Sequence, residues 1–501
     1  MKKLAFIGFV LLALVFPARA QQDLVLFTPV SGRIEAGSQQ SYRFQAVEGS
    51  LLSFVVQAAS GDLDPQISIT NSAGAAIIGN DDYHYPESGD SLIEAITIPR
   101  TDTYTATVSG FGGTSGEYNL SMLAGYGLVS ASQNFNGSLS WQAAAEPLQV
   151  EAVDGQLALA LDGPEQVGAA VDRGLNVPPV YFARVSVTVT TSQANWMVGL
   201  TARQTGTNAF YLLTINERGQ WRFSVRTSGQ DRMIRDWTPH PAILAGNKTF
   251  TLAMLVNGSN FDFFYNDSLI GRLTDTTISE GGRLGLAVIT DSSRTAQMSA
   301  RFDNLTITTP VLVDGSPVPP SQLILSAPAG MAQELQRRNV IPSGGEMALT
   351  VGESFIGSAR PGVERFMLGR GASFRNFALG TTFSWQADAE GITGCGLIFA
   401  AADETHYTLA YLDRAGGYGI SQRQGDSFVP GLFGEKPLPE KSAYHLLVVV
   451  LEDRVLYYVD GVYGGTLEMA AVDGAVGNAV VNFEPVNTSC QFRDTWVWRW
   501  S

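Results

Sequence analysis

The sequence predicts an all-β protein with three domains: a small β-sandwich and then two larger sandwiches that share one plan. Short runs of Val, Ile, Thr, Phe and Tyr alternate with polar residues and stop at Gly, Asn, Asp or Pro, as in Val185–Val189. This is the pattern of strands joined by tight turns, and many such strands are typical of sandwiches and barrels. The 53 glycines supply turns. We expect one short helix, around 330–338.

The second observation is a long internal repeat, which indicates two copies of one fold. Four blocks recur in order: Phe210–Ile215 as His406–Tyr411, Phe263–Asp267 as Leu456–Asp460, Leu284–Val288 as Val476–Val480, and Phe302–Asn304 as Phe492–Asp494. The offset falls only from 196 (406 minus 210) to 190 (492 minus 302). Chance matches would not keep both their order and a near-constant offset.

The start of the chain reads as a secretory signal peptide, residues 1–20, cleaved after Ala20. Two lysines precede an apolar stretch, Leu4–Phe16, that is too short to span a bilayer, and Ala18-Arg19-Ala20 is a small-x-small cleavage site. An uncleaved anchor is the rival interpretation. We expect four further segments: a first domain at 21–124, sandwich copies at 128–311 and 323–501, and a stiff, extended Pro-rich linker at 312–322.

Charge and hydropathy exclude some partners. The formal charge is −15, and loss of Lys2, Lys3 and Arg19 with the signal would make it −18. An acidic surface repels phosphate backbones, so we expect no nucleic-acid partner. No later run of 18 apolar residues exists, so we do not expect an integral membrane protein. The acidity suits a soluble secreted protein, and it also suits carboxylates that hold calcium.

Only two cysteines occur, Cys395 and Cys490, both in the last domain. We expect them to pair in an oxidising compartment, with two free buried thiols as the alternative. They correspond to Val198 and Ala300 of the first copy, which are expected to be buried strand positions. One disulfide cannot hold a chain of this size together, so the hydrophobic cores must do so.

Residues 23–124 resemble the bacterial pre-peptidase C-terminal domain, a small β-sandwich of secreted proteins. The resemblance lies in Ser41–Phe44, Gly61–Pro65, Gly79–Asp82, Asp90–Ile93, Thr103–Val108 and Gly116–Leu120. One departure is Thr101-Asp102 before Thr103-Tyr104, where the family usually has Gly. The family implies a place beside secreted peptidases, but the chain shows no peptidase domain. We therefore expect a passenger or binding module.

Carboxylates cluster on the loops of this first domain. They are Asp62, Asp64, Asp81, Asp82 and Asp90. Calcium takes six to eight oxygens from flexible loops of this kind, and relatives of the domain hold calcium in similar loops. The alternative is that these residues form Asx turns that bond their own backbone and end strands.

Each large copy resembles the concanavalin A-like lectin and glucanase sandwich in its laminin G-like form. The resemblance rests on an aromatic strand before Glu217–Gly219 or Asp413–Gly417, and on hairpin turns at Asn266-Asp267 and Asp460-Gly461. Retaining glucanases on this scaffold carry a Glu-x-Asp-x-x-Glu run that aims paired acids into a cleft. Neither copy has that run, a His-Glu-x-x-His zinc motif or a phosphate-binding loop, so we predict no catalytic residues.

Aromatic residues remain as candidate ligand contacts. Five lie near expected turns: Trp221, Trp237, Tyr411, Tyr418 and Tyr463. In addition, Trp496-x-Trp498-x-Trp500 places three indoles on one side of a strand, because side chains alternate. Such a stripe can stack on sugars or pack a core, and core packing is favoured because indoles bury large areas.

The sequence therefore predicts a secreted, non-catalytic binding protein that recognises a polysaccharide, a glycoprotein or another extracellular component, with calcium as its only expected cofactor. Two linked modules of one type could raise avidity on a single polymer. One alternative is a divergent glycan hydrolase whose acids come from separate loops. The other is a structural spacer in a surface layer.

Overall fold

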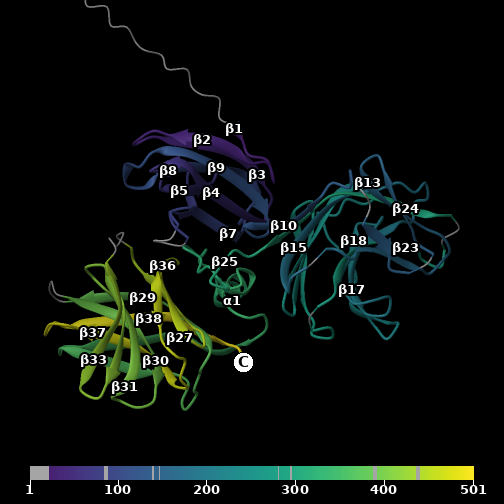
Figure 1. Cartoon of the computed structure of the whole chain (residues 1–501). Coiled ribbons are helices and arrows are strands. Elements are labelled where there is room, and N and C mark those ends of the chain that lie inside the picture. Colours follow the sequence, from purple (N-terminus) through teal and green to yellow (C-terminus); the bar gives the residue numbers. More distant parts are fainter. Residues whose placement is uncertain are drawn as a thin grey trace, which may run out of the picture.

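The computed structural model describes residues 22–83, 88–137, 140–145, 147–175, 177–279, 281–293, 296–387, 392–435 and 441–501. Figure 1 shows three lobes of strands with one helix, α1 (Pro328–Arg337), between them. The all-β prediction is confirmed. The helix begins two residues before the predicted start, at Pro328, a residue that suits the first helical turn. The predicted signal peptide lies outside the described residues.

The N-terminal domain is a two-layer β-sandwich. Its strands are β1 (Gln22–Asp23), β2 (Val30–Ile34), β3 (Gln39–Ala46), β4 (Leu51–Gly61), β5 (Pro65–Thr70), β6 (Ala76–Asn80), β7 (Ser91–Thr97), β8 (Asp102–Gly110) and β9 (Gly116–Ala124), with a 3-10 turn, η1 (Phe111–Gly113). They form the sheets β1-β3-β8-β5-β6 and β2-β9-β4-β7. Alternate residues of β3 and β8 point inward, so that Phe44 stacks on Tyr104 with ring centroids 5.5 Å apart.

The second lobe, sandwich 1, packs two long sheets face to face. Its strands are β10 (Leu128–Gln133), β11 (Trp141–Ala143), β12 (Gln149–Val153), β13 (Gln156–Leu161), β14 (Val167–Asp172), β15 (Val180–Val189), β16 (Met197–Gln204), β17 (Phe210–Asn216), β18 (Gln220–Thr227), β19 (Gln230–Pro239), β20 (Thr249–Asn257), β21 (Asn260–Tyr265), β22 (Ser268–Thr274), β23 (Arg283–Ile289) and β24 (Met298–Thr309). The back sheet is β12-β13-β24-β15-β20-β21-β22, with β10 also on β24, and the front sheet is β11-β14-β23-β16-β17-β18-β19.

The third lobe, sandwich 2, has the same plan. Its strands are β27 (Glu346–Ser358), β28 (Gly362–Met367), β29 (Phe377–Ala387), β30 (Thr393–Ala401), β31 (His406–Asp413), β32 (Gly417–Gln424), β33 (Ser427–Glu435), β34 (Tyr444–Val450), β35 (Arg454–Val459), β36 (Val462–Glu468), β37 (Ala475–Asn482) and β38 (Thr488–Arg499). The back sheet is β27-β38-β29-β34-β35-β36 and the front sheet is β28-β37-β30-β31-β32-β33.

Strand order and register agree with the inference of two copies. Strands β15 to β24 match β29 to β38 one by one, and each pair of equivalent strands has the same place in its sheet. Register also corrects the offset in the first block. Val198 pairs with Ile215 and Cys395 with Leu412, so 197 residues separate equivalent positions in these strands, and Phe210 matches Tyr407 rather than His406.

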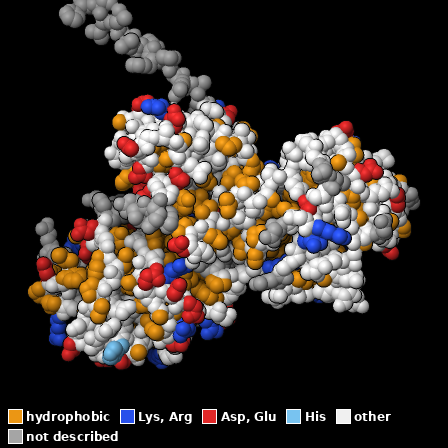
Figure 2. All heavy atoms as spheres, in the orientation of Figure 1, with side chains coloured by type: hydrophobic (Ala, Val, Ile, Leu, Met, Phe, Trp, Pro, Cys, Tyr) orange, Lys and Arg blue, Asp and Glu red, His pale blue; other side chains and the backbone are white. Residues whose placement is uncertain are grey.

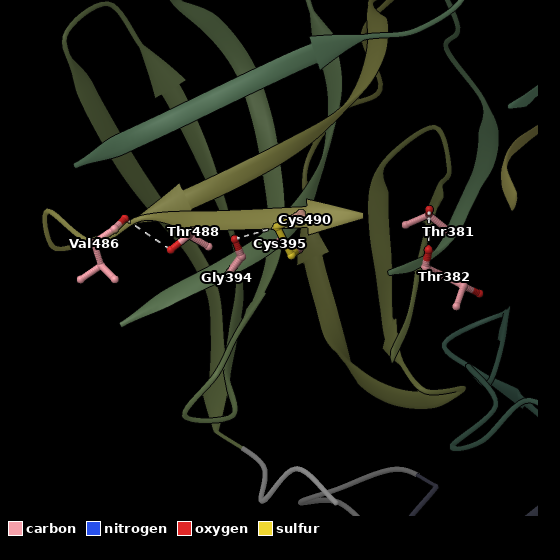
Figure 3. The surroundings of a disulfide bond; sticks show 7 residues. All are labelled: Thr381, Thr382, Gly394, Cys395, Val486, Thr488 and Cys490. Atoms are coloured by element: carbon pink, nitrogen blue, oxygen red, sulfur yellow. Dashed lines mark hydrogen bonds between the residues drawn. A yellow bond between two sulfur atoms is a disulfide. The ribbon is translucent and has the colours of Figure 1, made fainter. Parts of the chain in front are cut away.

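A disulfide joins the two sheets of sandwich 2, as predicted. Cys395 on β30 and Cys490 on β38 are fully buried, and the bond crosses from the front sheet to the back sheet (Figure 3). The matching residues of sandwich 1, Val198 and Ala300, are also buried. The bridge therefore occupies core space that two apolar side chains fill in the other copy.

Both back sheets are covered by other parts of the chain. The outer side of the back sheet in sandwich 1 packs against the N-terminal domain, where Leu51 and Tyr126 meet Phe182 and Phe264. In sandwich 2 the corresponding surface packs under α1 and its flanks, and Trp496 lies there beside Met331. The Trp496-x-Trp498-x-Trp500 stripe is thus packed, as favoured, but beneath the helix rather than between the sheets.

The segment between the sandwiches differs from the predicted extended linker. Strands β25 (Leu312–Val313) and β26 (Ser316–Pro317) form a small hairpin. Its turn residues, Asp314 and Gly315, have φ values of +50° and +78°, which fit a tight two-residue turn. The predicted hairpin turns at Asn266-Asp267 and Asp460-Gly461 likewise have positive φ values.

Candidate functional site

Among the described residues, no back sheet, helix or linker covers the outer faces of the two front sheets. On each front sheet, the apolar cluster on the side away from the core consists only of residues from that sheet. Figure 2 shows hydrophobic side chains at the surface of the lobe formed by sandwich 2. The covered back sheets offer no comparable free face, so the two front faces are the candidates for ligand contact.

The front face of sandwich 2 carries an aromatic residue between two glycines. One row of paired residues crosses the sheet as Arg365, Ala479, Gly396, Tyr411, Gly419 and Phe433. Glycine has no side chain, so neighbouring side chains lie over the backbone on both sides of Tyr411. A Cβ on Gly419 would lie 2.9 Å from the Phe433 ring, and a Cβ on Gly396 would lie 3.1 Å from the Leu409 side chain. The two glycines therefore let the rings of Tyr411 and Phe433 lie close to the sheet.

Further aromatic rings surround Tyr411. The Phe483 ring lies 5.8 Å from that of Tyr411. Phe433 is 53% exposed and Phe483 51% exposed, whereas the body of Tyr411 is buried between its neighbours. Burial, and then the nearby Asp413 carboxylate, raises the pKa of Tyr411. Its hydroxyl therefore stays protonated at neutral pH and can donate a hydrogen bond.

Two arginines lie flat over aromatic rings on the same face. The Arg365 guanidinium is 4.7 Å from the centroid of Tyr407, and that of Arg423 is 5.0 Å from the centroid of Phe428. Cation–π contacts of this kind hold a guanidinium in place, and the Nε of Arg423 also donates to the carbonyl of Gly425 at 2.6 Å. The face thus combines ring surfaces with fixed hydrogen-bond donors.

Sandwich 1 fills the equivalent face with its own side chains. Its matching row reads Ala169, Ala287, Gly199, Thr214 and Arg222. Thr214 thus stands where sandwich 2 has Tyr411, and Arg222 where it has Gly419. The Arg222 guanidinium lies 4.5 Å from the centroid of Trp237. This copy therefore carries an arginine over a tryptophan where sandwich 2 carries Tyr411 and Phe433.

The second row shows the same contrast in charge. Arg226 of sandwich 1 corresponds to Arg423, and both pair in register with the next strand. In sandwich 1 that partner is Asp231, which receives two hydrogen bonds of 2.7 Å from Arg226. In sandwich 2 the register partner is Phe428, and the Arg423 guanidinium instead pairs with the exposed Asp426 at 3.8 Å. The arginine is held by a close, two-bond ion pair in one copy and by a longer, more exposed ion pair in the other.

Two carboxylates also lie on the front face of sandwich 2. Asp413 is beside Gly417, and Gly417 pairs with Glu435 on β33. Burial raises the pKa of Asp413, and Glu435 adds to the rise. Neighbouring strands lie about 4.8 Å apart, so backbones separated by one strand lie about 10 Å apart. Inverting glycosidases hold their two acids roughly 6.5–9.5 Å apart. The separation of this pair is close enough to that range for a catalytic role to be considered.

The repeat supplies a structural role for Asp413. Its Oδ1 accepts hydrogen bonds from the backbone N–H groups of Ala415 and Gly417, both at 2.9 Å. In sandwich 1 the equivalent Asn216 accepts from Arg218 and Gln220 at 3.0 and 3.1 Å. A neutral amide therefore makes the same turn without any acid chemistry. Asp413 is explained as a turn residue, and Glu435 stays an exposed carboxylate beside it.

The predicted calcium ligands of the N-terminal domain divide into two groups. Asp64 and Asp82 come together, since a Cβ on Gly89 would lie 3.2 Å from Oδ1 of Asp64 and 3.8 Å from Oδ1 of Asp82. Both oxygens are buried and have no hydrogen-bond partner. Burial, followed by the charges of Asp64 and Asp81, raises the pKa of Asp82 to about 6. Orphaned, mutually repelling oxygens of this kind fit a cation.

Of the other predicted ligands, Asp81 lies near enough for its charge to add to burial in raising the pKa of both Asp64 and Asp82, whereas Asp62 and Asp90 are placed differently. Asp62 is exposed. Asp90 accepts a hydrogen bond of 2.9 Å from the backbone N–H of Ala58, and Asp81 accepts one of 3.0 Å from that of Asp82. The Asp90 bond reaches a residue 32 positions away and is not an Asx turn, whereas the Asp81 bond is local to its own turn. Within the described residues, no group of three or more His, Cys, Asp or Glu side chains is placed to hold a metal. A calcium ion here would need backbone or water oxygens besides Asp64 and Asp82.

Three of the five aromatic residues predicted to contact a ligand pack inside the protein, so the prediction was wrong for them. Trp221 packs in the core of sandwich 1 against Phe263. Tyr418 stacks inside sandwich 2 on Tyr457, and Tyr463 lies beneath the helix beside Tyr458. Proximity to a turn does not say which side of a strand a ring takes. Only Trp237 and Tyr411 lie on a front face, and Arg222 covers Trp237. The sequence reasoning missed Arg365, Arg423, Phe428, Phe433 and Phe483.

Comparisons with known proteins add little to this geometry. No family model matches the chain, and a search of curated proteins found no match. Similar solved structures include a carbohydrate-binding module from Bacillus subtilis, which is 17% identical, covers 34% of this chain and 96% of its own, and has a TM-score of 0.28. A Bacillus licheniformis beta-glucanase has 12% identity, coverage of 36% and 99%, and a TM-score of 0.27. Sheep galectin-11 has 12% identity, coverage of 28% and 99%, and a TM-score of 0.20. Values this low carry no argument about ligand or activity. No helix among the described residues is long and apolar enough to cross a membrane.

Proposed function

We propose that this protein is a secreted, non-catalytic glycan-binding protein in which the front face of sandwich 2 holds the ligand. The observation that carries the proposal is the aromatic surface of this face, where Phe433 and Phe483 are about half exposed beside Tyr411. A pyranose ring has a flat apolar side and a rim of hydroxyls. Flat aromatic rings beside fixed donors suit both features.

Three further features support the proposal. The Cys395–Cys490 disulfide suits an extracellular protein. Arg365 and Arg423 present donors on the same face, which suits hydroxyl and carboxylate groups. The N-terminal domain and sandwich 1 serve as supports, because the equivalent face of sandwich 1 is filled by Arg222 and Trp237. The ligand class is a polysaccharide or the glycan of a glycoprotein.

Replacing Tyr411 with alanine is expected to weaken glycan binding at least tenfold, because truncation removes the ring and hydroxyl at the centre of the aromatic surface that Phe433 and Phe483 complete. Tenfold corresponds to about 1.4 kcal/mol, within the range for an aromatic contact in a binding site. A glycan array would first identify a ligand for the wild-type protein, and titration calorimetry would then compare the variants. Phe433→Ala should show a smaller loss in the same direction.

Trp237→Ala is the matched control, since it truncates an aromatic residue on the equivalent face of sandwich 1. It should leave the affinity unchanged within about twofold. Equal losses in Tyr411→Ala and Trp237→Ala would mean that both copies bind. The absence of saturable binding to any glycan would favour the structural spacer and overturn the proposal.

A glycan hydrolase remains the second candidate, because Asp413 and Glu435 lie one strand apart on the same face. Asp413→Asn tests it cleanly, since Asn216 shows that an amide serves the turn. We expect no turnover of a polysaccharide panel by the wild-type protein and no change in melting temperature in the variant. Turnover that Asp413→Asn abolishes, in a protein that stays folded, would make this an enzyme.

We further propose that Asp64 and Asp82 hold a calcium ion. Without calcium, Asp82→Asn should stabilise the N-terminal domain at pH 7 by about 1 kcal/mol, after allowance for solvent screening. The folded-state pKa is raised to about 6 from an ordinary 3.8, so the carboxylate costs stability as the pH rises through this window. Calcium should reverse the order, with a higher melting temperature for the wild type than for the variant.

Scanning calorimetry with calcium or with a chelator makes the measurement. Asp102→Asn is a suitable control, because Asp102 belongs to the same domain and bonds Ser72 rather than another acid. An equal response of all three proteins to calcium would place any binding elsewhere and contradict the assignment to this pair.

A further inference from the structure

Residues from all three lobes meet around helix α1 through buried polar groups. Figure 1 shows the helix between the lobes. Two arginines at its C-terminal end, Arg337 and Arg338, have side chains only 7% and 2% exposed. Charged side chains are rarely buried this deeply unless they are paired, so their partners show what the helix holds.

Arg337 joins the N-terminal domain to sandwich 1. Its Nε donates to Oδ2 of Asp262 on β21 at 3.2 Å, and Nη1 donates to the hydroxyl of Thr97 at the end of β7. Nη1 also pairs with Glu334 on the helix at 3.3 Å. Each of these three partners belongs to a different part of the chain. One guanidinium therefore ties the helix to two domains.

Arg338 and its neighbours extend the contacts to sandwich 2. Arg338 lies 3.6 Å from Glu334 and donates to the backbone carbonyl of Gln322 at 2.6 Å. Two backbone hydrogen bonds join this segment to Gly461 and Tyr463 of sandwich 2. The N–H of Leu323 donates to the carbonyl of Gly461 at 2.7 Å, and the N–H of Tyr463 donates to the carbonyl of Ser321 at 2.8 Å.

The same stretch of chain reaches back to the N-terminal domain. The side-chain oxygen of Gln322 accepts a hydrogen bond of 3.1 Å from the N–H of Gly79. Gln322 thus touches the N-terminal domain directly, while its backbone holds Arg338. The linker and the helix together form a single structural unit between the lobes.

Glu94 of the N-terminal domain accepts hydrogen bonds from the two segments where sandwich 1 begins and ends. Its Oε1 accepts hydrogen bonds from the N–H of Gly127 at 2.9 Å and from that of Val311 at 2.8 Å. Gly127 immediately precedes β10 and Val311 follows β24, the first and last strands of sandwich 1. The carboxyl group is buried, with the residue 7% exposed. Tyr126 adds a hydrogen bond of 2.9 Å from its hydroxyl to the carbonyl of Arg337.

We propose that helix α1 and Glu94 form a three-way latch that holds the N-terminal domain, sandwich 1 and sandwich 2 in one fixed arrangement, and that the Glu94 arm of this latch loosens as the pH rises. The geometry carries the first part, since each lobe contributes a partner. The chemistry of Glu94 carries the second, because it is the one carboxyl group of the junction whose two acceptor bonds go only to backbone N–H groups of another domain.

The charges around Glu94 explain the direction of the response. The described junction contains three acids, Glu94, Asp262 and Glu334, and three arginines, Arg272, Arg337 and Arg338. Tyr126 and Tyr458 also face it, and burial raises the pKa of both, so they stay neutral. Burial raises the pKa of Glu94 to about 7, although Arg338 and the two backbone N–H groups oppose the rise.

A raised carboxyl pKa means that the docked state holds its proton more tightly than the opened state. Docking is therefore favoured at low pH and weakens as the pH rises from the ordinary value of 4.5 to about 7. The difference corresponds to a change of up to about 300-fold in the docking equilibrium across this window. Above it, docking should change no further through this group.

The backbone N–H groups of Gly127 and Val311 donate to Glu94, so their hydrogen exchange reports this opening directly. In the wild-type protein, protection of the Gly127 and Val311 amides, corrected for intrinsic exchange, should fall by up to about 300-fold between pH 4.5 and pH 8. Glu94→Gln keeps an acceptor oxygen but cannot titrate, so its protection should be independent of pH. Glu117→Gln, an exposed site in the same domain, should behave as the wild type. Equal pH dependence in all three proteins would overturn the pH response.

Spin labels test the fixed arrangement. Cysteines introduced in pairs at Ala73, Ala245 and Ser427, one exposed site on each lobe, give three interlobe distances by electron resonance. At pH 5 the wild-type background should give narrow distributions, and Arg337→Met should broaden the distance between Ala73 and Ala245. Broad distributions in the wild-type background would show lobes that move independently and would overturn the latch. Retention of a cooperative calorimetric transition in Arg337→Met separates loosening from unfolding.

Discussion

Replacing Cys395 and Cys490 with valine and alanine is expected to destabilise sandwich 2 by roughly 4–5 kcal/mol. The bond closes a loop of 95 residues, and loop closure restricts the unfolded chain more as the loop lengthens. The substitutions copy Val198 and Ala300 of sandwich 1, so the folded state keeps apolar side chains at both positions. Scanning calorimetry should show the sandwich 2 transition move to lower temperature.

The control is the same measurement on the wild-type protein after reduction, which breaks the bond without changing the core volume. Both routes should lower the stability of sandwich 2 by similar amounts. A loss below about 1 kcal/mol would mean that the oxidised fold is strained or that the reduced chain stays compact. A larger loss in the double variant than after reduction would assign the excess to packing.

Long-range pattern, rather than any single residue, made the architecture predictable. Two near-identical strand orders follow from a repeat that the sequence shows as ordered blocks. The Asn266-Asp267 and Asp460-Gly461 turns were predictable because positive φ favours these residues. The alignment of the first block was wrong by one residue. Aromatic residues occur at Phe210 and Tyr211 in one copy and at Tyr407 and Tyr411 in the other, so matching aromatic residues does not fix the register. A one-residue slip changes which face a side chain occupies, so the site could not be read from the blocks.

The candidate site depends on pairing across strands that are distant in sequence. The residues near Tyr411 in the sequence do not indicate that Gly396 and Phe433 lie on the same row of the sheet. They also do not indicate that Arg365 lies at the far end of that row. The glycines were read as turn residues, but at these positions they make room on the sheet for the rings of Tyr411 and Phe433. The sequence does contain a signal, because Tyr411 corresponds to Thr214 of the other copy and Gly419 corresponds to Arg222. That signal becomes readable only at an offset of 197.

The tryptophan stripe shows a further limit. Alternation correctly places Trp496, Trp498 and Trp500 on one side of β38. It does not reveal that this is the outer side, where the cover is a helix from the linker between sandwiches. The linker itself was expected to be a passive, extended connector, because Pro-rich composition describes local stiffness and not the contacts that a segment makes. Buried charge on Arg337 and Arg338 was likewise invisible, since a helix end with arginines usually faces water.

Arg337→Ala is expected to lower the free energy of unfolding by about 3–5 kcal/mol, because it leaves Asp262 and Glu334 buried with fewer partners. Arg272 still pairs with Asp262, at 3.2 Å, and Arg338 still approaches Glu334, so the loss should lie toward the lower end. Urea denaturation measures it, and the transitions of the N-terminal domain and sandwich 1 should separate, because their shared anchor is gone.

Arg375→Ala is the matched control, since Arg375 also pairs with a carboxylate, Glu452, at 3.1 Å, but both side chains are about half exposed or more. A surface pair of this kind contributes about 1 kcal/mol or less. Arg337→Met keeps part of the buried volume, so a smaller loss than in Arg337→Ala would measure the packing of the side chain. If both Arg337 variants matched Arg375→Ala, the ion pairs at the helix would not hold the lobes together. Their burial would then be a consequence of apolar contacts such as Tyr126 against Phe182.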